Sequence, residues 1–158
     1  MALNELSSVP AAVRFPIGLL AAGAAVLVMD LLMARLPEGT TPPKVAAGVL
    51  TRTAVDDAPA RLASLAHYLA GVGTGLLFVY VSILAEWLLG GASLLSVGAA
   101  TITLYVLMVA FFLLVPLPRA PGLSQARRST TGRDWAIAAA GYLAVLVPIS
   151  VGFTLVFA

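Results

Sequence analysis

Hydrophobic residues form four long runs along this chain, and the connections between the runs are short. The runs cover approximately residues 11–36, 62–89, 94–117 and 135–157. About 20 helical residues, at roughly 1.5 Å per residue, cross the ~30 Å hydrocarbon core of a bilayer. The pattern therefore predicts an all-α polytopic membrane protein in which residues 1–158 form one domain, a four-transmembrane-helix bundle.

The three connections differ in length and composition. Residues 37–61 begin with PEGTTPP, which ends the first helix because proline cannot continue it. Within that connection, residues 44–52 are apolar with basic flanks, so we expect a short amphipathic helix on the membrane surface. Gly90 and Gly91 leave few residues between the second and third runs, which predicts a tight antiparallel hairpin. Residues 118–134 predict a polar loop.

Basic residues are concentrated on one side of the predicted membrane. Eight of them border the first and third connections, and only Arg14 lies on the opposite side. The eight are Arg35, Lys44, Arg52, Arg61, Arg119, Arg127, Arg128 and Arg133. Because cytoplasmic loops carry an excess of Lys and Arg, both termini are expected outside (N-out and C-out) and the long loops in the cytoplasm. We therefore expect a multi-pass membrane protein, with the lipid bilayer as a partner.

Composition excludes several classes of protein. The chain is 61% hydrophobic and 10% charged, whereas soluble domains are about 25% charged. It has no cysteine, which excludes disulfides, Cys-ligated metals and thiol oxidoreductases. Its only lysine, Lys44, lies in a predicted loop, so no chromophore is held by a Schiff base within a span. The basic residues flank predicted spans and need no nucleic-acid partner; we expect neither nucleic acid nor a cofactor.

Two ionisable residues lie at similar depth in neighbouring spans. Asp30 is about six residues from the cytoplasmic end of the first span and His67 about six residues into the second, so both lie roughly 9 Å below the boundary. A carboxylate beside an imidazole in low dielectric is a candidate polar or proton site. Alternatively the pair only fixes helix packing, or Asp30 pairs with Arg35 or Arg61. No third ligand is evident, so we expect no metal.

Four further residues of the second span are candidates for a functional or packing role. Tyr68 is an interface anchor or part of a polar cluster with Thr74, and it points about 100° around the helix from its predecessor. Glu86 is either an ordinary interfacial acid or the outer station of a path across the membrane. Gly71 and Gly75 are four residues apart and form a GxxxG-type face, which favours close helix packing.

Two short motifs carry a resemblance to a family. Met29-Asp30 closes the first span, and His67-Tyr68-Leu69-Ala70-Gly71 opens the second. In these motifs the chain resembles a group of uncharacterised prokaryotic four-span membrane proteins, which have Met-Asp and His-Tyr-x-x-Gly at the same places. The resemblance covers mostly the first two spans. It implies a four-span fold in the prokaryotic cell membrane. It singles out these residues, and it implies no particular activity.

These features lead to two functional hypotheses from different classes. The first is a small integral membrane protein of transport or membrane homeostasis, in which Asp30 and His67 form a polar site near the cytoplasmic face. The second is a non-catalytic scaffold or accessory subunit that packs against other membrane helices. A lipid-modifying enzyme would need a larger cluster of catalytic polar residues at one interface, so an enzyme is not favoured. Four short helices favour a homo-oligomer or a complex with other membrane proteins.

Overall fold

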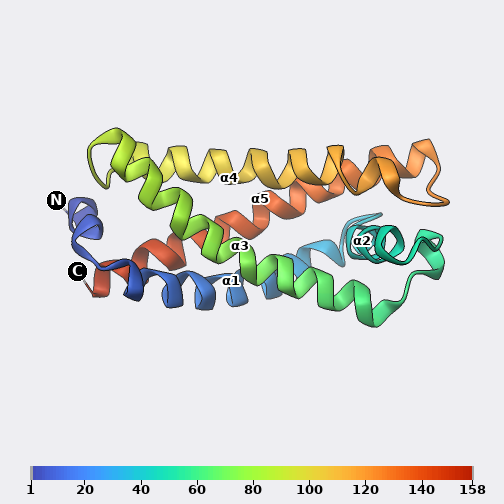
Figure 1. Cartoon of the computed structure of the whole chain (residues 1–158), viewed down its shortest axis with the longest axis horizontal. Coiled ribbons are helices and arrows are strands. Elements are labelled where there is room, and N and C mark those ends of the chain that lie inside the picture. The colour runs from blue at the N-terminus through green and yellow to red at the C-terminus, as the bar shows by residue number, and fades with distance from the viewer. Residues whose placement is uncertain (1, 158) are drawn as a thin grey trace.

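The computed structural model describes residues 2–157, and within this range the fold is entirely helical (Figure 1). Of its five α-helices, four are long and apolar enough to cross a membrane. These four are α1 (Ala11–Met33), α3 (Ala60–Leu89), α4 (Leu94–Leu114) and α5 (Gln125–Val156). The shorter elements are the helix α2 (Thr41–Thr51) and the 3-10 segments η1 (Ala2–Ser8), η2 (Val55–Asp57) and η3 (Leu117–Arg119). The predicted all-helical fold with four apolar helices is confirmed.

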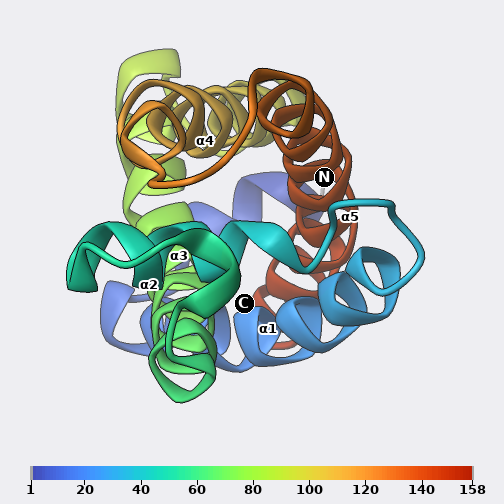
Figure 2. The ribbon, with the colours of Figure 1, turned by 90° about the vertical axis from the view of Figure 1, so that its right-hand side faces the viewer.

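The four long helices surround a common interior. Helix α1 packs against α3 and α5, and α4 packs against the same two helices from the other side. Helices α3 and α4 meet at their turn and diverge towards the opposite end of the molecule, where α2 lies across the opening (Figures 1 and 2). The two chain ends lie together at the end far from α2 (Figure 1).

The turn between α3 and α4 is built by glycine and serine. Gly90 ends α3 with a φ of 80°, and Gly91 follows with a φ of 134°, a left-handed region that favours glycine. Ser93 then caps α4, because its hydroxyl accepts a hydrogen bond from the backbone N–H of Ser96 while the Ser96 hydroxyl accepts from the N–H of Ser93. The predicted tight hairpin is confirmed.

The predicted start of the last helix was wrong. Helix α5 begins at Gln125 rather than at residue 135, so residues 125–134 are helical and the preceding loop is correspondingly shorter. Ser124 provides the N-cap, since its hydroxyl accepts a hydrogen bond from the N–H of Arg127. Thr131 and Asp134 are fully buried, so this polar segment packs into the protein instead of lying in a loop.

The short helix α2 is longer than predicted and has an internal partner. It begins at Thr41, and Pro42 and Pro43 occupy its first turn, where proline's fixed φ suits a helix and its missing N–H removes no bond. Val45 and Ala47 are completely buried, and the helix packs against α3. The first span correspondingly ends at residue 33 rather than 36. Helix α2 therefore covers the end of the helical interior (Figure 2).

The GxxxG-type face of α3 packs against α1 within the same chain. A Cβ atom added to Gly75 would collide with the carbonyl oxygen of Gly18 and lie 2.5 Å from the Cβ of Ala22. A Cβ atom added to Gly71 would lie 2.5 Å from Cγ2 of Val26. Real Cβ atoms do not approach other heavy atoms so closely, so both positions require glycine for the two helices to lie this close.

We therefore expect Gly75→Ala to destabilise the protein by about 1–3 kcal/mol, the usual effect of overpacking a tight contact. Gly73→Ala is the matched control, because a Cβ there has no neighbour within 4 Å and alanine favours the helix. Thermal unfolding in detergent measures both variants. Equal or higher melting temperatures for both would show that the α1–α3 contact does not depend on Gly75.

Candidate functional site

Asp30, His67 and Tyr68 form a hydrogen-bonded cluster between α1 and α3. Oδ1 of Asp30 lies 2.7 Å from Nε2 of His67. The hydroxyl of Tyr68 donates a hydrogen bond of 2.8 Å to Oδ2 of the same carboxylate. The His67 side chain is 9% exposed and the Asp30 side chain 33% exposed. The structure thus brings together three of the residues that the sequence singled out.

Tyr68 belongs to this cluster and not to a separate interface position. His67 and Tyr68 are about 100° apart around α3, so their side chains reach the carboxylate of Asp30 from two sides. The hydroxyl of Thr74, the partner that the sequence suggested for Tyr68, instead donates to the carbonyl oxygen of Ala70. Because His67 and Tyr68 occupy both oxygens of Asp30, the expected alternatives with an arginine are not formed among the described residues.

The ring of His67 keeps one free nitrogen. With Asp30 ionised, Nε2–H donates to the carboxylate, and no described residue hydrogen-bonds to Nδ1. Among the described residues, Oγ1 of Thr131 is the only fully buried side-chain polar atom that lacks a hydrogen-bond partner. Nδ1 of His67 also lacks a partner, so it is not fully buried. Nδ1 can therefore accept a hydrogen bond, and it becomes a donor when the ring takes up a proton.

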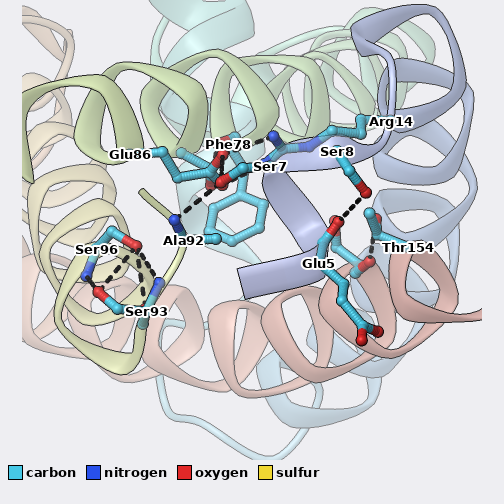
Figure 3. Close-up of polar contacts among 12 residues, drawn as sticks. Glu5, Ser7, Ser8, Arg14, Phe78, Glu86, Ala92, Ser93, Ser96 and Thr154 are labelled. Atoms are coloured by element: carbon cyan, nitrogen blue, oxygen red, sulfur yellow. Dashed lines mark hydrogen bonds and ion pairs between the residues drawn. The ribbon is translucent and has the colours of Figure 1, made fainter. Parts of the chain in front are cut away.

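A second polar cluster lies at the opposite end of the same helix pair (Figure 3). The guanidinium of Arg14 on α1 donates two hydrogen bonds to the carboxylate of Glu86 on α3, at 2.6 and 2.8 Å. Ser7 donates to Glu86 at 3.4 Å and accepts a hydrogen bond of 2.9 Å from the N–H of Ala92. Helix α1, helix α3 and the N-terminal segment η1 are therefore joined at one point.

Glu86 is held in an enclosed ion pair with Arg14. The side chains of Arg14 and Glu86 are only 10% and 9% exposed, and the bidentate geometry is the strong form of this ion pair. Between His67 and Glu86 along α3, the interior is filled by the apolar core around Phe78 and Leu104. No hydrogen bond between described residues connects the two clusters.

Several residues that form these polar contacts could not be recognised from the local sequence. Arg14 is a single basic residue near the start of a span, and its pairing with a residue 72 positions away follows only from the fold. Tyr142 is completely buried, and its hydroxyl donates a hydrogen bond of 2.6 Å to the carbonyl oxygen of Gly71. A tyrosine in an apolar run is the one available hint, since a buried hydroxyl needs a partner.

A third polar cluster fastens the first connection to α5. Arg127 contacts the carboxylates of Glu38 and Asp56, at 2.7 and 2.9 Å. Hydrogen bonds from this guanidinium lower the pKa of both carboxyl groups. The buried carboxylate of Asp134 accepts hydrogen bonds from the N–H of Glu38 and from Arg133. These contacts hold α2 in its place across the end of the helices.

Metal binding has no support at this site. Within residues 2–157, no group of three or more His, Cys, Asp and Glu side chains is arranged to hold an ion. Asp30 and His67 supply two donors, and the hydroxyl that completes their cluster is a phenol with its proton directed at the carboxylate. What the arrangement can do chemically is take up, release and share protons.

No protein-family model matches this chain, and no curated protein and no solved structure matches it. The resemblance in Met29-Asp30 and in the His67–Gly71 motif is therefore carried by those residues alone. What the protein does must be inferred from the geometry of its own side chains.

The Arg14–Glu86 cluster is expected to hold the fold together. Glu86→Gln leaves the buried guanidinium of Arg14 without a counter-charge, and we expect it to cost about 3 kcal/mol or more. The double variant Arg14→Met with Glu86→Met removes both charges and is expected to unfold close to the wild-type temperature, because replacing a buried pair by apolar residues is often neutral. Thermal unfolding in detergent compares the two. A harmless Glu86→Gln would contradict this role.

Proposed function

We propose that this chain is an integral membrane protein that crosses the bilayer four times and titrates protons at the Asp30–His67–Tyr68 cluster. Its four apolar helices would form a bundle with both termini outside, and α2 would lie at the cytoplasmic side. The role is one of transport or membrane homeostasis, in the prokaryotic cell membrane. Support for the orientation comes from the basic residues near α2, since Lys and Arg accumulate in cytoplasmic loops.

One observation carries this proposal. The single histidine of the chain lies within an apolar span, pairs with a carboxylate at 2.7 Å and keeps its other nitrogen free. Ionisable groups inside a membrane are costly and usually serve a function. Histidine is also the side chain whose charge changes between about pH 5 and 8. The unoccupied nitrogen lets the ring take up a second proton while its contact with Asp30 is kept.

A scaffold or accessory subunit is the second candidate, and the exposure of α4 favours it. Ile102, Val106 and Phe111 of this helix are each more than half exposed, so a large apolar surface is free to meet lipid or another membrane protein. The glycine face of α3 is already occupied by α1. A homo-oligomer or a membrane complex would therefore use large exposed side chains, such as those of α4.

The proposed orientation has a direct test, because the chain has no cysteine of its own. Ser8→Cys and Ser129→Cys introduce single thiols at exposed positions on opposite ends of the molecule. In intact cells, a membrane-impermeant maleimide is expected to label the cysteine at 8, and to label the one at 129 only after the membrane is opened. The reverse labelling pattern would contradict the proposed orientation.

Protonation of the cluster can be followed at a single residue. Because His67 is the only histidine, a ¹⁵N-histidine-labelled sample in lipid nanodiscs has one pair of ring signals. We follow these signals between about pH 5 and 8, the range in which histidine ordinarily changes its charge. We expect them to respond to pH, and Asp30→Asn to alter the response because the carboxylate that holds Nε2–H is lost. Arg35→Gln is a matched control, since it removes a charge five positions after Asp30 that forms no hydrogen bond with the ring.

Two results would contradict the proposal. Ring signals that stay constant over this range would mean that His67 does not exchange protons at physiological pH. An identical response to pH in wild type and Asp30→Asn would mean that the two groups do not act together. Either result would leave the scaffold as the better candidate.

A further inference from the structure

A large apolar cavity adjoins His67 inside the helices. Its volume is about 430 Å³, and residues of all four long helices and of α2 contribute to its wall. Small-molecule sites commonly have ~300–1,000 Å³ and an apolar, aromatic lining with few polar groups. This cavity fits that description, since Phe111, Phe112, Trp135 and Tyr142 line it together with His67.

The cavity is closed on one side and open on the other. Leu104 and Tyr142 are completely buried and form its closed end, next to the apolar core. Leu77 of α3 and Leu107 and Phe111 of α4 also line it, and their exposed fractions are 43%, 48% and 64%. These residues belong to α3 and α4, the two helices that diverge from their common turn (Figure 1). In a bilayer, this opening faces the hydrocarbon chains of the lipid.

The polar groups at one end of the cavity determine which kind of ligand head group can bind there. His67 belongs to the wall, and its Nδ1 is the free nitrogen of the cluster. While Nε2–H is held by ionised Asp30, Nδ1 presents a lone pair, which accepts a hydrogen bond from a hydroxyl group. The carboxylate behind the ring disfavours an anionic head. The other polar groups, such as Tyr142 and Trp135, already donate to backbone carbonyls.

We propose that this cavity binds the hydrocarbon chain of an uncharged, hydroxyl-bearing lipid amphiphile, whose hydroxyl donates to Nδ1 of His67. The molecule enters sideways from the bilayer between α3 and α4. Helix α2 covers the polar end, where Pro43 and Ala46 complete the wall and Arg127 fastens the preceding loop. This inference deepens the proposed function by naming a ligand class for the same site, and it depends on that proposal only for the role of His67.

Fluorescence quenching can report occupancy from within the cavity. The chain has two tryptophans, and Trp135 lines the cavity while Trp87 is 77% exposed near the α3–α4 turn. Trp87→Phe therefore leaves one reporter. The probe is 9,10-dibromostearyl alcohol added to phosphatidylcholine nanodiscs that contain this variant, because bromine quenches tryptophan on contact. Methyl 9,10-dibromostearate is the matched probe, with the same chain and no hydroxyl donor.

We expect quenching by the alcohol to saturate at a low mole fraction, as a bound ligand requires. Ala70→Phe fills the cavity and is expected to weaken binding at least tenfold, whereas Leu69→Phe, at an exposed position outside the cavity, leaves it unchanged. If Ala70→Phe does not fold, Ala66→Phe fills the same space. The alcohol is expected to bind about five- to tenfold more tightly than the ester, and His67→Phe removes that preference.

Quenching that rises linearly with the mole fraction of the alcohol, and equally in the Ala70→Phe and Leu69→Phe variants, would overturn the site. The alcohol would then be dissolved in the bulk lipid and not bound in the cavity. Equal affinity for alcohol and ester would overturn the contact with His67. These outcomes are separable from the proton-site proposal. Saturable quenching with a non-titrating His67 would remove the proton site alone, and a titrating His67 with linear quenching would remove the ligand site alone.

Discussion

The close antiparallel contact between α1 and α3 is the constraint on which the rest of the structure depends. Gly18, Gly71 and Gly75 let the two backbones meet near the middle of the helices. The register set there also brings Asp30 to His67 at one end and Arg14 to Glu86 at the other. Neither polar pair would form if the helices were held apart by larger residues, because short side chains such as Asp30 reach only a close neighbour.

The two ends of this helix pair use their polar groups differently. At the end with Arg14, both oxygens of Glu86 bind this guanidinium, and Ser7 adds a third contact, so the cluster is satisfied and enclosed. At the opposite end, Asp30 is one-third exposed and a nitrogen of His67 is free beside a large apolar cavity. A satisfied pair supports structure, whereas unused hydrogen-bonding capacity next to an open volume is what a binding or proton-transfer site provides.

Much of this fold follows from the sequence, because run length and turn chemistry are local. The four apolar helices, the Gly90–Gly91 hairpin and the depth match of Asp30 with His67 could all be predicted. The early start of α5 could not, since its polar first turns are stabilised by Glu38 and Arg127, which are 89 residues apart. The cavity was equally out of reach, because it depends on how far α3 and α4 diverge, and no local pattern encodes that angle.

The central claim is that Asp30 and His67 are retained for chemistry and not for stability. A double-mutant cycle with Asp30→Asn and His67→Gln, read as thermal unfolding in detergent at neutral pH, tests it most directly. The account predicts that each single variant unfolds near the wild-type temperature and that the coupling energy stays below about 0.5 kcal/mol. Strongly destabilised single variants with a coupling energy of about 1.5 kcal/mol or more would contradict it, and would make this pair a second structural clamp.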